Sequence, residues 1–78
     1  MSAVDLELDC RDLACPMPII RLSQTIGRVP VGGTVGVVAR DAAARSDVPA
    51  WCRMRGHEFL GEDVAGDGTP RYRVRRLS

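Results

Sequence analysis

The chain changes from a strand pattern to a helix pattern at Cys15-Pro16-Met17-Pro18. Two prolines in three positions would disrupt the interior of a helix. The first turn tolerates them, because its N–H groups have no intrahelical partner and the fixed φ of proline suits a helix. We therefore predict that a helix begins here, with the Cys15 thiol at its N-terminal cap.

This predicted position gives Cys15 a chemical role. A helix N-terminus carries a partial positive charge, which favours thiolate over thiol, and a thiolate is a nucleophile. The alternative is a small residue buried in a strand-to-helix turn, since free cysteine is among the most buried residue types. Pro-x-Pro directly after a chosen residue arises by chance about once in 400, so the prolines favour the activated thiol.

Upstream of this junction, apolar residues alternate with charged ones, which is the pattern of a half-buried strand. The apolar positions are Val4, Leu6, Leu8 and Cys10. Downstream, apolar residues recur on one face of a helix that extends through Arg28. This face consists of Ile19, Leu22, Ile26 and Val29. The pair Gly32-Gly33, after Pro30, ends the helical segment.

The second half of the chain predicts a strand, a helix and a hairpin. Residues 34–39 are apolar enough for a central strand. A second helix is expected to begin with Ser46 as its cap and to end at Gly56. One side of it carries Val48, Trp51, Cys52 and Arg55. Residues 59–64 and 71–75 read as strands around a Gly-rich turn, which favours an antiparallel hairpin.

The element order is therefore β-α-β-α-β-β, in a single domain over residues 1–78. This order predicts an α/β (α+β) two-layer sandwich, with a four-stranded mixed sheet and two helices on one face. A chain of 78 residues has no room for a separate substrate domain. Any chemistry should therefore lie at the surface or be completed by a partner.

Composition narrows the function classes. The net charge is +1, and all 11 basic residues are arginine, so the balance does not itself point to nucleic acid or a membrane. Acidic residues interrupt the N-terminus before any signal-peptide pattern can form, and no stretch is apolar enough to span a bilayer. The three cysteines are an odd number, which favours free thiols in a reducing cytoplasm over a disulfide framework.

The stretch around the junction reads Leu8-Asp9-Cys10-Arg11-Asp12-Leu13-Ala14-Cys15-Pro16-Met17-Pro18. It resembles the signature of the TusA/SirA/YedF-like sulfur carrier proteins, which is Leu-Asp, a Gly-Leu pair and then Cys-Pro-x-Pro. The resemblance continues, in the family's order, through Val31-Gly32-Gly33-Thr34, Asp41, Asp47-Val48-Pro49 and Trp51-Cys52. With the final hairpin, it covers nearly the whole chain.

The resemblance implies a sandwich that carries sulfur as a persulfide on Cys15. A cysteine desulfurase or another sulfurtransferase would donate the sulfur, and a downstream protein would accept it. In such relatives the sulfur reaches tRNA 2-thiouridine, molybdenum-cofactor enzymes or dissimilatory sulfur oxidation. This thiol exchange depends on thiolate fraction and access, and it needs no metal or organic cofactor. We expect a sulfurtransferase-like persulfide carrier rather than a self-contained enzyme.

Five residues are expected to support the motif thiol. Pro16 and Pro18 set the helix start and hold the thiol outward, while Asp9, Arg11 and Asp12 shape the approach. Asp12 stands where the family has Gly, and Asp tolerates the φ > 0 of such a turn better than most residues. Its charge would raise the thiol pKa, and Arg11 is close enough in sequence to offset it.

The other thiols and the single histidine have structural readings. The alternation of Cys10 with Leu8 favours the core, and the alternative is a resolving thiol that attacks a persulfide and closes a disulfide. Cys52 lies on the apolar helix face and is assigned to the core. His57 is expected to be structural. The chain lacks a paired ligand spacing such as Cys-x-x-Cys, so a metal site is not expected.

The last predicted strand places Arg71, Arg73 and Arg75 on one face, with Arg76 beside them. We interpret them as a solvated face that protects an exposed sheet edge. The alternative is a docking patch for an acidic partner. Without aromatic interleaving, direct nucleic-acid binding is not expected. The rivals to a sulfur carrier are a non-catalytic regulatory or interaction module on the same fold, and a thiol redox protein using Cys10 and Cys15.

Overall fold

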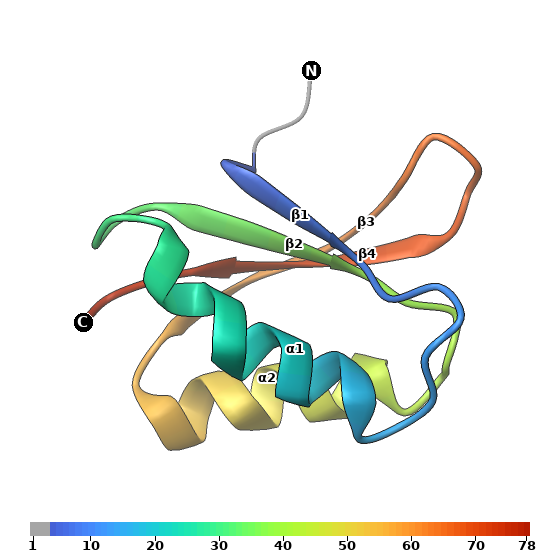
Figure 1. Ribbon diagram of the computed structural model, residues 1–78, viewed down its shortest axis with the longest axis horizontal. Helices are drawn as coiled ribbons and strands as arrows, with labels where there is room; N and C mark the ends of the chain where they lie inside the picture. Colours follow the sequence, from blue (N-terminus) through green and yellow to red (C-terminus); the bar gives the residue numbers. More distant parts are fainter. Residues whose placement is uncertain (1–3) are drawn as a thin grey trace.

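The computed structural model describes residues 4–78, in which four strands and two α-helices form two layers (Figure 1). The elements are β1 (Leu6–Asp9), α1 (Met17–Thr25), a 3₁₀ turn (Ile26–Arg28), β2 (Thr34–Val38), α2 (Ala44–Arg55), β3 (Glu58–Val64) and β4 (Pro70–Arg75). Both helices lie on the same face of the sheet. The predicted fold class, element order and layer arrangement are confirmed.

The sheet is mixed, with strand order β1-β2-β4-β3. β1 and β2 are parallel neighbours, joined by the crossover through α1. β4 pairs antiparallel with both β2 and β3. The predicted hairpin therefore forms, and its second strand lies inside the sheet. Because β1 and β2 are parallel, their carboxyl ends lie side by side at the same end of the sheet. The loops that lead into α1 and α2 both begin there.

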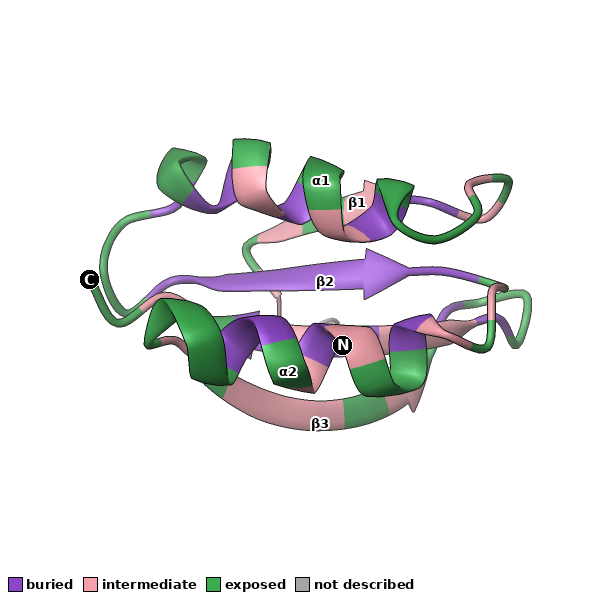
Figure 2. Ribbon diagram, turned by 90° about the horizontal axis from the view of Figure 1, so that it is seen from below, coloured by how far each residue is buried: buried purple, intermediate pink, exposed green. Residues whose placement is uncertain are grey.

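The core lies between the sheet and the helices, and β2 is buried along its whole length (Figure 2). From the sheet, Val35, Val37, Tyr72 and Val74 face the helices, because side chains alternate along a strand. The helices contribute Leu22, Ile26, Val48, Trp51 and Cys52. The indole Nε1 of Trp51 donates a 2.8 Å hydrogen bond to Ser23 Oγ, which ties α2 to α1.

Arginines cover the opposite face of the sheet. A side chain at Gly36 would lie 2.9 Å from Arg71 Cδ, so this glycine makes room for the arginine stem. The Arg71 guanidinium pairs with Asp63 at 2.8 Å and with Glu7 at 2.9 Å. Arg75 pairs with Glu58 at 3.3 Å. The expectation that these arginines protect an exposed sheet edge is therefore wrong, because β4 is an interior strand. Their exposure on this face varies, since the side chain of Arg71 is 13% exposed and that of Arg75 is 44% exposed.

Two helix boundaries differ from the prediction. The first α-helix ends at Thr25, and residues Ile26–Arg28 continue as a 3₁₀ turn. The second helix begins at Ala44 rather than after a Ser46 cap. Ser46 lies in the first turn, where its Oγ donates to the carbonyl of Ala43. Gly56 ends α2 in the left-handed conformation, as predicted. No helix among residues 4–78 is long and apolar enough to cross a membrane.

Candidate functional site around Cys15

Cys15 lies in the loop between β1 and α1 and is exposed. The first helical residue is Met17, and Pro16 holds the cap position with no side-chain cap hydrogen bond. Pro18 is buried in the first turn, so the prolines do mark the helix start. The thiol, however, stands one residue before the cap. A capping thiolate would accept hydrogen bonds from the first N–H groups of the helix, and the Cys15 sulfur does not.

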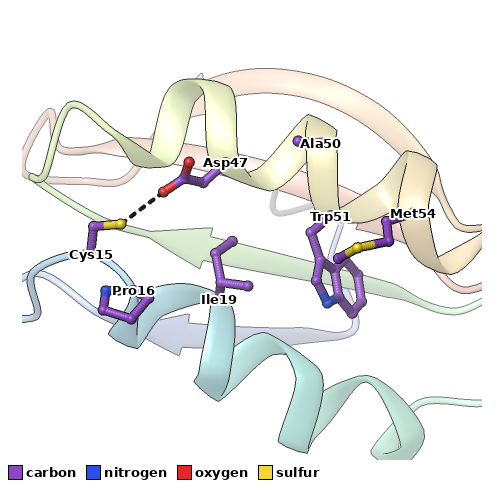
Figure 3. Close-up of a pocket in the computed structure, with 7 residues that line it drawn as sticks. All are labelled: Cys15, Pro16, Ile19, Asp47, Ala50, Trp51 and Met54. Carbon is purple, nitrogen blue, oxygen red and sulfur yellow. Dashed lines mark hydrogen bonds between the residues drawn. The ribbon is translucent and has the colours of Figure 1, made fainter.

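Two carboxylates make hydrogen bonds to Cys15, one from the loop between β2 and α2 and one from α2. Asp41, three residues after the end of β2, accepts the Cys15 backbone N–H at 3.0 Å through Oδ2 and the Ala43 N–H at 2.9 Å through Oδ1. These two bonds lower the pKa of Asp41 and join the two loops at the sheet edge. Asp47 of α2 accepts a 3.1 Å hydrogen bond from the Cys15 thiol through Oδ2 (Figure 3).

The resting thiol is therefore protonated. The hydrogen bond to Asp47 raises the pKa of Cys15 above its ordinary value, and partial desolvation and the charges of Asp47 and Asp41 act in the same direction. The expectation that a helix end stabilises the thiolate is wrong for this structure. The reason is geometric, because the sulfur points across to a carboxylate of α2 instead of toward the N-terminus of α1.

The thiol opens onto an apolar groove between α1 and α2 (Figure 3). The groove has a volume of about 330 Å³. Its lining consists of Cys15, Pro16, Ile19, Asp47, Ala50, Trp51 and Met54. Met54, at the end away from Cys15, is 76% exposed. Exposed apolar surface next to a reactive group suits contact with another protein. Asp47 is the charged residue of this lining, so the thiol proton faces a carboxylate in otherwise apolar surroundings.

The predicted supporting charges lie on the same loop but act on other groups. Arg11 pairs with Asp67 and Asp9, each at 3.0 Å. The backbone N–H of Arg11, and then its side chain, lower the pKa of Asp9, and the hydrogen bond from the Arg11 side chain lowers the pKa of Asp67. Asp12 is almost fully exposed and pairs with Arg40 at 3.3 Å. The expected contest between Asp12 and Arg11 over the thiol is therefore wrong, since neither contributes to the Cys15 pKa shift.

Asp12 also does not adopt the conformation expected of a glycine replacement. Within residues 4–78, positive φ occurs only at glycines. Asp12 therefore needs no left-handed backbone, and its turn is compatible with any L-residue. The departure from the family signature at this position leaves the loop unstrained.

The other two cysteines are buried in the core, as their patterns predict. Cys10 is 1% exposed, and burial raises the pKa of its thiol. Cys52 is also 1% exposed, and burial raises its pKa to about 11. A resolving role for Cys10 would require that it leave the core. His57 stacks on Trp51 with ring centroids 5.2 Å apart, and its Nδ1 accepts the Leu77 N–H, which is a structural arrangement.

Reasoning from the sequence missed the roles of Asp41 and Asp47. A signal for both exists in the predicted topology. Parallel neighbouring strands end at the same sheet edge, and sites in such folds gather outside those ends. An Asp that follows β2, and another in the first turns of the next helix, were therefore candidates to meet Cys15, which follows β1.

The chain is similar to proteins of known type over most of its length. Residues 6–76 match the profile of the family described as Sulfurtransferase TusA. The Sulfur carrier protein TusA of Pseudomonas syringae pv. syringae (strain B728a) is 41% identical over 75 residues, which span 96% of this chain and 88% of the relative. The Putative sulfur carrier protein YrkI of Bacillus subtilis (strain 168) is 38% identical over 63 residues, which span 81% of this chain and 84% of that protein.

A solved structure supports the fold. The crystal structure of a SirA-like protein from Desulfitobacterium hafniense superposes with a TM-score of 0.77. The alignment covers 94% of this chain and 99% of that chain. At 18% identity, this likeness concerns the architecture of the two proteins.

Proposed function

The chain belongs to the TusA family of sulfurtransferases, and on that premise we propose that it carries sulfane sulfur as a persulfide on Cys15. The observation that carries this proposal is the contrast among the three thiols. Cys15 is exposed at the end of an apolar groove, whereas Cys10 and Cys52 are buried. Thiol exchange requires access to the attacking sulfur, and Cys15 meets that requirement.

The proposed reaction is an exchange without net oxidation. Cys15 Sγ loses its proton and attacks the outer sulfur of a donor persulfide. The new sulfur–sulfur bond forms as the bond inside the donor persulfide breaks, and the donor sulfur leaves as a thiolate. Discharge repeats these steps with an acceptor thiol as the attacking group. No metal or organic cofactor takes part in either step. Pro16 and Pro18 fix the start of α1, and Arg11 pairs with Asp9 in the segment that leads to the thiol.

The proposed partners are proteins. The donor is a cysteine desulfurase or another sulfurtransferase, and the acceptor is a downstream carrier or enzyme, with tRNA 2-thiolation as one destination, in the cytoplasm. Exposed apolar side chains on the two helices support protein contact, namely Met17 and Ile20 of α1 and Met54 of α2, which lines the groove. The arginines of β4 are engaged in ion pairs on the other face of the sheet, and the proposal assigns them no direct role with nucleic acid.

The test is sulfur loading followed by intact mass measurement. The protein is incubated with a cysteine desulfurase and cysteine, and we expect the mass to rise by one sulfur atom. Cys15→Ser should abolish this gain. The matched control is Cys52→Ser, which removes a buried thiol on α2 and should retain loading if the variant folds. Absence of sulfur addition from several donors would overturn the proposal.

The same measurement separates the redox alternative. A thiol redox protein would lose two hydrogens instead of gaining sulfur, and the loss would require both Cys10 and Cys15. Because Cys10 is buried, we expect no such loss in the folded protein. An interaction module without sulfur chemistry would show neither mass change.

A further inference from the structure

The Cys15–Asp47 contact joins the reacting atom of the proposed function to a carboxylate. The thiol donates to Asp47 Oδ2 at 3.1 Å. Asp47 projects from α2 into the groove toward the sulfur (Figure 3). Any sulfur transfer at Cys15 must move this proton, because Sγ carries it in the resting thiol and lacks it once the sulfur–sulfur bond has formed. The carboxylate already lies at hydrogen-bond distance, which is the geometry required of a general base.

The charges around the thiol are negative. The two groups whose charges act on it are Asp47 of α2 and Asp41 of the loop after β2. On the thiol's own side, Arg11 is held by Asp9 and Asp67, and the nearby Arg40 is held by Asp12. Within residues 4–78 no arginine forms an ion pair with Asp41 or Asp47. Among these described residues, none thus supplies a cation in contact with a Cys15 thiolate.

This arrangement makes two routes to the attacking sulfur unequal. If the proton leaves for water, the thiolate and the Asp47 carboxylate become two anions in contact, in a groove that is otherwise apolar. If the proton moves to Asp47, the Cys15 and Asp47 side chains together carry one negative charge before, during and after the proton transfer. A partner that covers the groove and excludes water increases this difference, because like charges repel more strongly at low dielectric.

We propose that Asp47 takes the Cys15 proton as the bond to the incoming sulfane sulfur forms, and returns it to Cys15 when that sulfur leaves. This inference rests on the proposed sulfur-carrier function. It makes Asp47 a catalytic residue, since its Oδ2 touches the reacting group.

Bonds and protons balance in both directions. During loading, the electron pair of the Sγ–H bond forms the new sulfur–sulfur bond, the proton goes to Asp47 Oδ2, and the bond inside the donor persulfide breaks. The donor sulfur keeps that electron pair and leaves as a thiolate. During discharge, an acceptor thiolate attacks the outer sulfur. Cys15 Sγ then leaves with the bonding pair and regains the proton from Asp47. Neither direction needs an oxidant or a reductant.

The test compares Asp47→Asn with Asp12→Asn. Both changes remove one negative charge near Cys15 without adding volume, but only the first removes the thiol contact. Two rates are measured on each protein, namely alkylation by iodoacetamide and sulfur loading. Loading is followed with a persulfidated cysteine desulfurase and with glutathione persulfide, a small donor that needs no docking surface. Thermal unfolding confirms that the variants are folded.

We expect the two rates to move in opposite directions in Asp47→Asn. Alkylation should become faster, because the thiol ionises more easily without the adjacent charge. Loading from both donors should fall by about tenfold or more, as expected for loss of a general base. Asp12→Asn should change both rates by less than about twofold. Asp47→Glu, which keeps a carboxylate, should recover most of the loading rate.

The pH profile adds a signature that a merely structural role would not produce. Loading of the wild type should change little between about pH 6 and 8, because the proton goes to Asp47. In Asp47→Asn, loading should rise by about tenfold per pH unit over this range, in parallel with the thiolate fraction. A parallel rise of the two wild-type rates with pH would contradict the proposal.

The outcomes separate this inference from the function on which it rests. If Asp47→Asn loads as fast as the wild type, or gains in step with alkylation, Asp47 only suppresses the thiol and the inference is overturned while the function stands. Loss of loading from the desulfurase alone would make Asp47 a docking contact and would also overturn it. If neither donor loads the wild type, the proposed function fails first.

Discussion

The two faces of the sheet handle polar groups in opposite ways. On the helix-covered face, Val35, Val37 and Val74 pack in an apolar core. On the other face, which we call the open face, Arg71 lies across Gly36, and its guanidinium is neutralised by carboxylates from β1 and β3. The helix-covered face stabilises the protein by burying apolar side chains. The open face is covered by ion-paired side chains instead of helices.

The difference teaches where function can be placed in so small a protein. On the open face, Glu7, Asp63 and Glu58 have arginine partners, so their charges support the sheet. Asp41 and Asp47, at the edge of the helix-covered face, make hydrogen bonds to Cys15 instead. Carboxylates that are paired with arginine stabilise the sheet, whereas the two carboxylates that contact the exposed Cys15 thiol affect its reactivity. Four comparisons probe the two faces, beginning with the largest expected effect.

Truncation of the core should cost the most. Leu22 of α1 is fully buried between the layers, so Leu22→Ala removes buried methyl groups and leaves a cavity. We expect the free energy of unfolding in urea to fall by about 3 kcal/mol. Ile20→Ala is the matched control on the same helix, since Ile20 is 40% exposed, and it should cost less than about 1 kcal/mol. Equal losses would mean that α1 does not divide the residues into buried and exposed faces.

A glycine of the open face should rank second. In Gly36→Ala the new Cβ would lie 2.9 Å from Arg71 Cδ and 3.2 Å from Cγ. These atoms cannot move freely, because ion pairs at the guanidinium hold the side chain. We expect a loss of about 1–2 kcal/mol in urea denaturation, typical of overpacking.

Gly27→Ala is the control for Gly36. A Cβ at Gly27 meets nothing within 4 Å, and its φ is not positive. The change should be neutral or slightly stabilising, because it restricts the unfolded chain. A Gly36→Ala variant as stable as Gly27→Ala would show that Arg71 is not packed against the sheet.

The fold could be predicted from the sequence because its signals are local. Alternation over 71–75 and the Gly-rich turn before it indicate a hairpin whatever lies elsewhere. The start of α2 could not be predicted as well. Ser46 resembles a cap, but Asp41 accepts the Ala43 N–H from outside the helix, and the helix begins three residues earlier than a Ser46 cap would place it. That β4 is an interior strand also depends on pairing with β2, which a local pattern does not reveal.

The site was predicted only in part for a similar reason. Cys15 and its prolines lie together in the sequence, so their pattern is visible. The groups that set its protonation are 26 and 32 positions away, and only the parallel pairing of β1 with β2 brings them to the thiol. The nearby Asp12, which sequence distance favoured, pairs elsewhere.

The ion pairs of the open face should differ with their exposure. Arg71 is 13% exposed and forms two hydrogen bonds with Asp63 at 2.8 and 2.9 Å. Arg75 is 44% exposed, and its contact with Glu58 is 3.3 Å. Double-mutant cycles with Arg71→Met and Asp63→Asn should give a coupling of about 1 kcal/mol, against less than about 0.5 kcal/mol for Arg75→Met and Glu58→Gln. Equal coupling energies would show that the burial of Arg71 does not strengthen its ion pair relative to that of the more exposed Arg75.

The two faces should also respond to acid in different pH windows, which is the smallest effect. Burial, with the charges of Arg55 and Arg76, lowers the pKa of His57 on the helix side. The unfolded chain therefore binds this proton more readily than the folded protein. The stability contribution of neutral His57 is complete above its unfolded pKa of about 6.5, and it declines as pH falls below that value.

On the open face, Arg71 lowers the pKa of Asp63. Its contribution is present above an unfolded pKa of about 3.9 and is lost only as pH falls through the lower folded value. Urea denaturation between about pH 7 and 5 should therefore show a decline in stability that His57→Gln reduces and Asp63→Asn leaves unchanged. A slope that persists in His57→Gln would place the acid-sensitive group elsewhere, and a slope abolished by Asp63→Asn would assign it to the open face.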